Sequence, residues 1–473
     1  ERPSGIAVIL MGPTDLESQW SPVLAPGESV ETVPVAIAQA VGGLDQGAAE
    51  LTRYRRALRG SNGDRVVPLV FNDYMNTLVG DPTTEKLLPL IDAAAIVGAE
   101  YFCIDAGWYD DSGKWWDGVG EWRPSTTRFP GGLGLVISRI HERGMIPGLW
   151  LEPEVIGVKS PLADSLPISA FLTRGGERVE LGGRYLLDFR SPATIAHLDA
   201  VVDRLVADFG LGFFKLDYNA TPGAGSDAGG VSAGVGLLEH NRAVLAWLDA
   251  VRTRHPHLVI ENCGSGAMRM DYAMLARLDL QSTSDQQDAV LYAAIAAAAP
   301  LSMIPEQAAN WAYPQSGMTR EEQVFALANG MLGALYLSGY LNRMSPEEVA
   351  LVSEAVRIHK GLRSHIATSV PFWPLGLPSW DAEWVVLGLQ SEGDRLLTVW
   401  HREGGPAAVD IPLAPPGTSS IDLTSVFPLD IPGWAFEWVP ESGVLRASTT
   451  IAEPSARVIR ITSQMSSPRE TSR

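Results

Sequence analysis

Between residues 66 and 362, short apolar runs alternate with segments in which apolar side chains recur every three or four positions. A short run that is apolar throughout is typical of a strand buried on both faces, and the longer period is typical of a helix packed on a sheet. One such helix begins at Ser191 and Pro192 and carries an apolar stripe to Phe209. The pattern predicts eight strands, over residues 66–71, 100–105, 145–151, 212–217, 258–262, 278–282, 300–304 and 334–338.

Eight β/α units in succession predict a closed (β/α)8 barrel, a fold of ~250 residues plus insertions. An open, doubly wound α/β sheet is the structural alternative. In a barrel the active site lies at the carboxyl ends of the strands, so candidate chemistry is sought there.

The segments on either side of the barrel predict β structure. Residues 6–10 and 30–39 predict two strands, and because two strands alone make no stable sheet, we expect them to be the tail of a larger N-terminal β-domain. Near the other end, residues 384–389 and 395–400 alternate around a Ser-Glu-Gly-Asp turn, which is typical of a hairpin. The predicted organisation is an N-terminal remnant and linker at 1–60, the barrel at 61–368, an antiparallel β-sandwich at 369–465 and a disordered tail at 466–473.

Charge and composition exclude several classes of protein. Lys and Arg number 36 and Asp and Glu 55, and the net charge of −19 argues against a nucleic-acid partner and an anionic membrane surface. No apolar run reaches the 18 residues of a membrane span. Two cysteines exclude a disulfide scaffold and a four-cysteine zinc site. The chain starts at Glu1 with no leader pattern after it, so its beginning identifies no compartment.

Polar side chains gather at the predicted strand ends. Carboxylates brought to one rim repel each other unless a function keeps them there, although each one alone could cap a strand or bond a loop amide. The set comprises Asn72, Asp73, Asp105, Trp150, Glu152, Glu154, Lys215, Asp217, Asn219, Glu261, Asn262, Cys263, Ser284 and Asp285.

The fourth strand ends in the segment FFKLDYN, in which alternation places Lys215, Asp217 and Asn219 on one face. The chain has only five lysines, and this one ends a buried strand. A cation two residues away should lower the pKa of Asp217 and keep it ionised, as a carboxylate nucleophile requires. A structural Lys–Asp pair is the alternative.

Asp285 follows the sixth strand and Asp217 the fourth, so both belong to the even-numbered strands and should face each other across the mouth. Two carboxyl groups ~5–5.5 Å apart, one ionised and one protonated, are what retaining glycoside hydrolysis requires. Asp288 lies further into the loop and is the weaker candidate for the acid. Trp115 and Trp116 could stack on a sugar or form a hydrophobic lid, and Trp311, expected in the loop after the seventh strand, leaves the same two alternatives.

Six motifs occur in the order of one known family: DAGW at 105–108, GEW at 120–122, GLWLEPE at 148–154, KLDYN at 215–219, ENC at 261–263 with Gly266, and STSDQQD at 282–288. Together they resemble the α-galactosidases (melibiases) of glycoside hydrolase family 36, clan D, over about residues 30–460. The resemblance implies a catalytic barrel between a large N-terminal and a smaller C-terminal β-domain.

The resemblance also implies roles for individual residues. Asp217 matches the nucleophile and Asp285 the general acid/base. Lys215, Arg184, Trp150, Cys263 and Gly266 match residues that line the sugar pocket. An α-linked oligosaccharide or glycoside substrate, a homo-oligomer, and no metal or other cofactor are further implications.

One position departs from the family's pattern. Asp105 matches the first of two adjacent aspartates that grip the sugar at its 4- and 6-hydroxyls, but the second is Ala106. An alanine side chain accepts no hydrogen bond, and galactose differs from glucose at carbon 4. An α-galactoside is therefore the favoured substrate, with an α-N-acetylgalactosaminide or another α-glycoside as the alternative.

Three readings outside the glycosidases remain from the residues themselves. Asp105, Glu152 and Asp217 could hold Mg²⁺ in a lyase or isomerase that uses Lys215 as base. A barrel that binds sugar without catalysis is the second. A Schiff-base aldolase on Lys215 is the third, and the adjacent Asp217 opposes it by keeping the lysine protonated.

Overall fold

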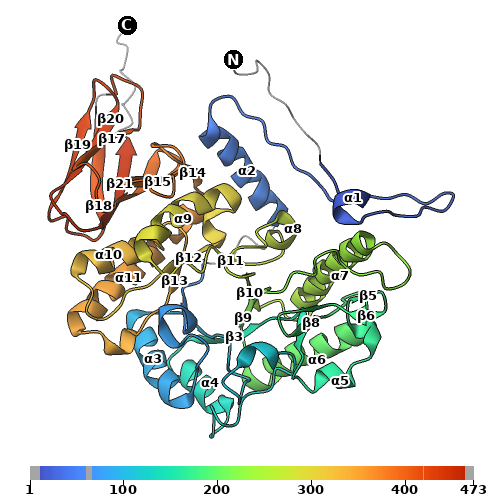
Figure 1. Cartoon of the computed structure of the whole chain (residues 1–473). Coiled ribbons are helices and arrows are strands. Elements are labelled where there is room, and N and C mark those ends of the chain that lie inside the picture. Colours follow the sequence, from blue (N-terminus) through green and yellow to red (C-terminus); the bar gives the residue numbers. More distant parts are fainter. Residues whose placement is uncertain (1–10, 60–66, 419, 464–473) are drawn as a thin grey trace.

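Eight parallel strands close into a barrel whose order is β1-β13-β12-β11-β10-β9-β3-β2. The computed structural model describes residues 11–59, 67–418 and 420–463. Figure 1 shows the strands at the centre of the molecule with helices around them. The closed ring confirms the predicted (β/α)8 barrel and excludes the open sheet. Its strands are β1 (Val70–Asn72), β2 (Tyr101–Ile104), β3 (Ile146–Leu151), β9 (Phe213–Leu216), β10 (Val259–Asn262), β11 (Leu280–Ser282), β12 (Ala308–Ala312) and β13 (Ala334–Leu337).

Seven of the predicted strands overlap observed ones, and the seventh prediction, at 300–304, is wrong. That stretch holds the end of helix α9 (Ala289–Ser302), and the seventh barrel strand is β12. Helix α9 is covered on most sides, so its apolar residues run together without a helical period, and such a run does not distinguish a helix from a strand. Trp311 therefore lies inside strand β12, fully buried, and not in a loop.

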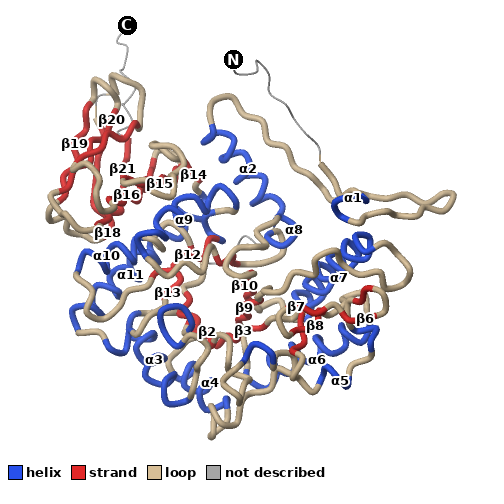
Figure 2. The backbone as a smooth tube through the Cα atoms, viewed as in Figure 1, coloured by secondary structure: helices blue, strands red, loops and turns tan. Residues whose placement is uncertain are grey.

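The helices alternate with the barrel strands along the chain, and Figure 2 shows them outside the strands. The expected helix after Ser191 is α6, with Ser191 at its N-cap and Pro192 in its first turn. The longer helices are α2 (Leu44–Arg59), α3 (Thr84–Val97), α4 (Leu133–Glu142), α6 (Pro192–Phe209), α7 (Ala233–Arg254), α9, α10 (Arg320–Ala328) and α11 (Pro346–Thr368). Shorter ones are α1 (Asp15–Ser18), α5 (Leu162–Ser165), α8 (Tyr272–Leu275), the irregular turn η2 (Tyr74–Leu78), and the 3₁₀ turns η3 (Trp115–Asp117), η4 (Ile168–Ala170), η5 (Pro305–Gln307) and η6 (Leu341–Arg343).

Two antiparallel sheets follow the barrel, with orders β14-β15-β16-β21-β18 and β17-β20-β19. One apolar cluster joins Leu397 and Ile459 of the first sheet to Ile411 and Leu445 of the second, so the sheets pack as a sandwich. The predicted hairpin is β15–β16. The strands are β14 (Val370–Phe372), β15 (Trp384–Ser391), β16 (Asp394–His401), β17 (Ala408–Pro412), β18 (Ile421–Phe427), β19 (Trp434–Val439), β20 (Val444–Thr449) and β21 (Ser455–Ser463).

The sandwich is fixed to the barrel by polar contacts as well as by packing. Arg457, which is fully buried, donates to both carboxylate oxygens of Glu321 on α10, at 2.7 and 2.9 Å. Trp373 donates from its indole nitrogen to the carbonyl of Ala297 on α9, at 2.7 Å. The segment between β14 and β15 is thereby held beside the barrel.

The N-terminal prediction is partly wrong. Residues 30–39 form no strand, and the described part of the segment before the barrel, residues 11–59, contains helices α1 and α2 instead. Figure 1 shows the connection between these helices as an extended loop. The predicted strand at 6–10 and the predicted tail at 466–473 lie outside the described residues.

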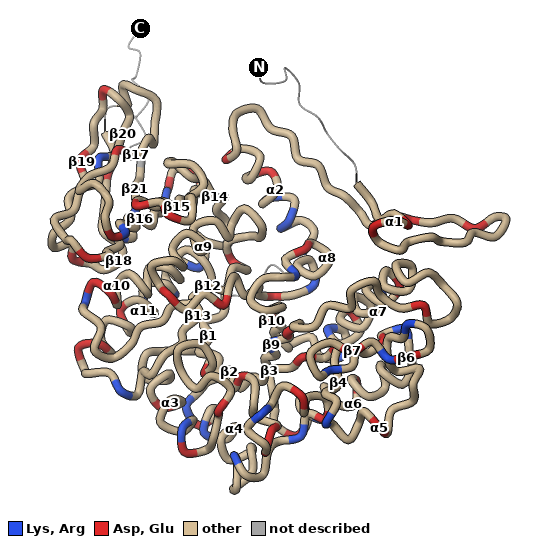
Figure 3. Tube along the Cα trace, in the orientation of Figure 1, with Lys and Arg blue, Asp and Glu red and all other residues tan. Residues whose placement is uncertain are grey.

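Acidic and basic residues are interspersed over the barrel helices and the sandwich (Figure 3). Among the described helices, none combines the length and the apolar character that crossing a bilayer would require.

A small sheet is inserted after barrel strand β3, where it carries part of the candidate site. It has the order β4-β8-β7, and a separate hairpin, β5–β6, lies beside it in the sequence. The strands are β4 (Val155–Gly157), β5 (Thr173–Arg174), β6 (Glu177–Arg178), β7 (Glu180–Leu181) and β8 (Arg184–Leu186).

Candidate active site

Asp217 lies directly after strand β9, at the carboxyl end of the barrel. Its Oδ1 accepts three backbone N–H groups, from Tyr218 at 2.8 Å, Gly264 at 2.9 Å and Ser265 at 3.0 Å. Its Oδ2 accepts the indole N–H of Trp150 at 3.1 Å. Burial opposes ionisation, but the Lys215 charge, a hydrogen bond from the Asn219 side chain and the backbone donors prevail and lower the pKa of Asp217 below its ordinary value. The carboxylate is therefore ionised and held in one orientation, with Oδ2 the less engaged oxygen.

Lys215 and Asp105 form a buried ion pair beneath this carboxylate. Nζ of Lys215 lies 2.8 Å from Oδ2 of Asp105, and both side chains are almost wholly buried. Burial works against the ammonium charge, yet the neighbouring Asp105 carboxylate raises the pKa of Lys215 well above its usual value. A permanently charged lysine cannot act as an amine nucleophile or as a base, which argues against the Schiff-base reading.

Arg184 comes from strand β8, about 30 residues beyond β3, and reaches the site through the small sheet β4-β8-β7. Its Nη1 bonds to Oε2 of Glu152, and neither side chain is exposed. Its Nε and Nη2 have no hydrogen-bond partner among the described residues. Oε1 of Glu152 accepts the backbone N–H of Asn219 at 2.7 Å, which fixes the segment after Asp217. Two unpaired buried donors are suited to a ligand's hydroxyl oxygens.

The turn from Cys263 to Gly266, directly after β10, lies between the two candidate carboxylates. On one side, the amides of Gly264 and Ser265 bind Asp217. On the other, Gly266 has a φ of +84°, and a Cβ there would lie 2.7 Å from the backbone nitrogen of Asp285. Glycine is thus required both by the backbone conformation and by the close approach. Burial and the Asp217 charge raise the pKa of the Cys263 thiol, which makes it a pocket wall and not a nucleophile.

Asp285 lies in the loop after β11 with its side chain open to the mouth of the barrel. Partial desolvation at this rim and the nearby charges of Asp217 and Asp105 raise its pKa, against the opposing effect of Lys215. The two candidate carboxyls therefore have pKa values shifted in opposite directions. Oδ1 of Asp288 instead accepts the amides of Val290 and Leu291, so Asp288 caps helix α9 and is not placed as an acid.

Aromatic rings form one wall of the pocket. Trp150 packs edge-on against Trp115, with ring centroids 5.5 Å apart, and lies near parallel to Tyr109 at 6.2 Å. Trp116 covers Arg184, whose guanidinium carbon lies 3.1 Å from the ring centroid. Both alternatives for the Trp115–Trp116 loop remain, since it borders the pocket and also roofs Arg184.

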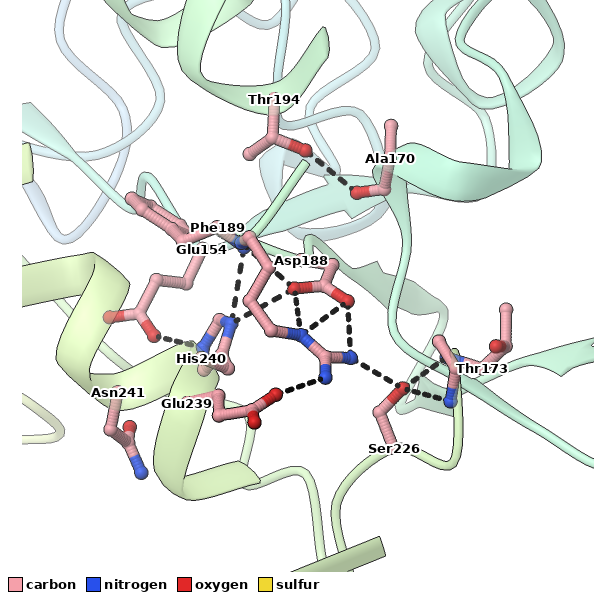
Figure 4. Close-up of polar contacts among 12 residues, drawn as sticks. Glu154, Ala170, Thr173, Asp188, Phe189, Thr194, Ser226, Glu239, His240 and Asn241 are labelled. Carbon is pink, nitrogen blue, oxygen red and sulfur yellow. Dashed lines mark hydrogen bonds and ion pairs between the residues drawn. The ribbon is translucent and has the colours of Figure 1, made fainter. Parts of the chain in front are cut away.

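A buried histidine supports the strand end that carries Glu152. Figure 4 shows His240 of α7 between Glu154 and the backbone of Phe189. The N–H of Phe189 donates to Nδ1 at 3.2 Å, so Nδ1 bears the lone pair and Nε2 donates to Glu154 at 3.3 Å. Arg269 also bonds Glu154, and together these donors overcome burial and lower the pKa of Glu154 to about 2. Glu154 thus has a structural role and is not placed to react.

Two further buried carboxyls lie near Lys215, Asp73 directly after β1 and Glu261 on β10 in register with Lys215. Burial, with the charge of Asp105, raises the pKa of Asp73 well above its usual value. Burial also raises the pKa of Glu261 to about 8, although Lys215 and a hydrogen bond from the hydroxyl of Tyr336 oppose it. Glu261 is therefore protonated over much of the neutral range.

We expect Glu261→Gln to stabilise the protein increasingly as the pH rises from about 4.5 to about 8. In that window the folded wild type retains a proton that the unfolded chain releases, so its unfolding free energy falls as pH rises. Glutamine removes this loss, and the gain over wild type should grow by on the order of 3 kcal/mol between the two ends. Denaturant unfolding across pH measures it, with the exposed Glu180→Gln as control. A gain that does not depend on pH would contradict the assignment.

The carboxylates proposed for a Mg²⁺ site do not converge. Asp105 is paired with Lys215, Glu152 with Arg184, and Asp217 with Trp150 and three amides. Within the described part of the chain, no three His, Cys, Asp or Glu side chains are arranged to hold a metal ion. The geometry does not favour the lyase or isomerase reading.

All nine predicted site residues lie around this end of the barrel or in loops that border it. The predicted site residues did not include Glu152, Tyr74 or Trp380. Glu152 carried a signal, because it follows a strand end. Tyr74, whose pKa is raised to about 12 by burial and by Asp105, and Trp380 of the β14–β15 loop lack a local pattern that marks them.

Curated relatives are similar to part of this chain. Alpha-galactosidase AgaA of Geobacillus stearothermophilus is 27% identical over 299 residues, which cover 60% of this chain and 39% of that protein. Alpha-galactosidase Mel36A of Lactobacillus acidophilus is 26% identical over 374 residues, 74% of this chain and 49% of that one. The chain therefore spans about half, or less, of the length of these relatives.

Solved structures share the fold. A variant of the GH36 alpha-galactosidase AgaA from Geobacillus stearothermophilus in complex with raffinose matches with a TM-score of 0.75 at 18% identity, over 89% of this chain and 59% of that one. The alpha-galactosidase from Lactobacillus brevis matches with a TM-score of 0.73 at 18% identity, over 90% and 59%.

The family model described as Melibiase matches residues 28–369. This span is more than half of the chain and includes every barrel strand and both candidate carboxylates. The resemblance that the motifs indicated is thereby confirmed: the chain belongs to the Melibiase family, the α-galactosidases of glycoside hydrolase family 36.

Proposed function

We propose that this protein hydrolyses α-galactosides with retention of anomeric configuration, with Asp217 as nucleophile and Asp285 as general acid/base. The observation that carries the proposal is the opposite shift of two carboxyl pKa values around one turn, 263–266. A carboxyl group whose pKa is lowered and a second one whose pKa is raised, at a single site, are the pair that double displacement needs. Family membership supports the reaction class.

In the first step, Oδ2 of Asp217 attacks the anomeric carbon of the α-glycoside from the opposite face and forms a β-linked ester. Asp285 gives its proton to the glycosidic oxygen as that bond breaks. The leaving group departs as a neutral alcohol. The three backbone amides on Oδ1 hold the Asp217 side chain in one rotamer during the attack, so no entropy is lost in orienting it.

In the second step, Asp285, now ionised, accepts a proton from water, and the water oxygen attacks the anomeric carbon from the α face. The ester bond to Asp217 breaks, and two inversions give net retention. Asp217 also balances the positive charge that develops at the sugar in each transition state. No step requires a metal or an organic cofactor.

Recognition of the sugar is assigned to the groups around Asp217. Lys215, Asp105 and the free N–H groups of Arg184 bond hydroxyls, while Trp150 and Cys263 form the walls. Asn219 and Gly266 shape the rim. An α-N-acetylgalactosaminide or another α-glycoside remains the alternative substrate because of Ala106, and a homo-oligomer remains a prediction.

A panel of 4-nitrophenyl glycosides tests the proposal. It contains the α-galactoside, α-N-acetylgalactosaminide, α-glucoside and β-L-arabinopyranoside, each with and without EDTA, and proton NMR follows the anomer released first. We expect fastest release from the α-galactoside, indifference to EDTA, and the α-anomer as initial product. Initial release of the β-anomer would contradict a retaining mechanism, and faster cleavage of another α-glycoside would select the alternative substrate.

We expect Ala106→Asp to raise selectivity for the α-galactoside over the α-glucoside by about tenfold. Ala106 is buried next to Asp105, whose Oδ1 accepts its N–H at 2.8 Å, so a carboxylate there adds an acceptor at this edge. The ratio of the two kcat/KM values measures it, and Ala106→Leu, which adds a side chain of similar size without an acceptor, is the control. An unchanged ratio would mean that the 4-hydroxyl is bound elsewhere.

A further inference from the structure

A hollow opens beside Asp285. It has a volume of about 540 Å³ and is lined by Ser265, Ser284, Asp285, Gln286, Gln287, Ile295 and Trp380. None of the buried residues Asp105, Lys215 or Trp150 borders it. Its size lies in the range of small-molecule sites.

Trp380 forms the aromatic wall of this hollow. Of the chain's fourteen tryptophans, all of which are described, only Trp116 and Trp380 are exposed, at 39% and 54%, and both lie at the mouth of the barrel. A single exposed apolar residue is ordinary. An exposed indole that faces a hollow shared with a candidate catalytic acid is not explained by packing.

The loop that carries Trp380 is held in place. Arg402, itself buried, donates from Nη1 to the carbonyls of Trp380 and Ala382, at 2.8 and 3.0 Å. The hydroxyl of Ser379 donates to Asp381 at 2.7 Å within the same turn. The backbone beneath the indole is thus fixed, while the ring itself stays open to solvent.

Apart from Ile295, the other lining residues are polar. Gln286 and Gln287 carry amide groups, and Ser265 and Ser284 carry hydroxyls. A sugar ring has an apolar face and polar edges, so a lining that combines an indole with amides and hydroxyls matches it.

The place of Asp285 defines what this ligand is. A general acid must reach the glycosidic oxygen, the atom that joins the sugar held over Asp217 to the leaving group. A hollow that is lined by Asp285, but not by Asp105, Lys215 or Trp150, is therefore placed to receive the leaving group. We propose that the hollow between Asp285 and Trp380 is a leaving-group subsite, in which the indole stacks on a sugar ring of an oligosaccharide. This inference rests on the proposed function.

The test compares two substrates that differ only in what enters the hollow. Fluoride, the leaving group of α-galactosyl fluoride, occupies no such site, whereas raffinose places a sugar there. We expect Trp380→Ala to lower kcat/KM for raffinose about tenfold, mainly through a higher KM, and to change α-galactosyl fluoride less than about twofold. Trp380→Phe, which keeps a stacking ring, should recover most of the loss.

Leu377→Ala is the matched control, because Leu377 is exposed at 39% near Trp380 in the same loop but does not line the hollow. It should leave both substrates unchanged. Three outcomes would overturn the subsite and leave the proposed function standing. Trp380→Ala could lower activity equally on both substrates, it could lower activity on neither, or the wild type could cleave the fluoride but not raffinose. A wild type that cleaves neither substrate would overturn the proposed function and the subsite with it.

Discussion

Replacing Asp217 by asparagine is expected to lower kcat/KM by at least about 10⁴-fold on every α-galactoside, whatever its leaving group. The amide keeps an oxygen for the amides of Gly264 and Ser265, so the local geometry is retained. It supplies neither a nucleophile nor the negative charge that faces the developing positive sugar. Steady-state kinetics measure the loss, and thermal unfolding verifies that the fold persists.

Azide distinguishes the loss of a nucleophile from a general defect. In Asp217→Gly the missing carboxylate leaves room for a small anion on the same face of the sugar. Added azide should therefore restore cleavage of an activated α-galactoside and give the β-galactosyl azide. Turnover that persists in Asp217→Asn without azide, or an α-azide from Asp217→Gly, would assign the nucleophile to another group.

Asp285→Asn is expected to slow substrates with poor leaving groups by about 10³-fold and substrates with good leaving groups far less. A good leaving group departs without a proton, so the loss of Asp285 then slows only the second step, in which it acts as base. The pH profile should change too. The acid form of Asp285 is active and its pKa is raised, so wild-type kcat/KM falls as pH rises through that pKa, whereas the variant should lose this alkaline limb.

Asp288→Asn is the matched control, since asparagine caps a helix as well as aspartate and Asp288 caps α9. It should keep both activity and stability. Azide added to Asp285→Asn should give the α-galactosyl azide, because the covalent intermediate still forms and is attacked from the α face. Equal slowing of good and poor leaving groups by Asp285→Asn would remove Asp285 from the role of acid.

Local pattern was sufficient for most of the barrel because its strands are short apolar runs between amphipathic helices. It was insufficient where burial removes the pattern. Helix α9 is covered on most sides and was mistaken at its end for a strand, while β12, with the sequence AANWA, lacks the β-branched residues that mark strands. Helix α2 was missed because its buried face carries Thr52, Arg55 and Arg59, which an apolar pattern does not contain.

The same distinction applies to the site. Lys215, Asp217 and Asp285 stand at or just beyond strand ends, where the barrel itself indicates chemistry. Arg184 enters from an inserted sheet, and only the family resemblance placed it in the pocket. Trp380 lies in the loop between β14 and β15. Its neighbours in the sequence do not indicate that it borders the barrel mouth, because its position there depends on how the sandwich is fixed to α9 and α10.

The turn at 263–266 touches both carboxylates, binding Asp217 through two amides and allowing the backbone of Asp285 to approach Gly266. The separation of nucleophile and acid is therefore set by four consecutive residues and not by two independent loops. A wider separation admits a water molecule between the carboxyl groups and leads to inversion. The length of one short turn thus determines the stereochemical outcome. Surface loops of the barrel tolerate insertions, but this turn should contain none.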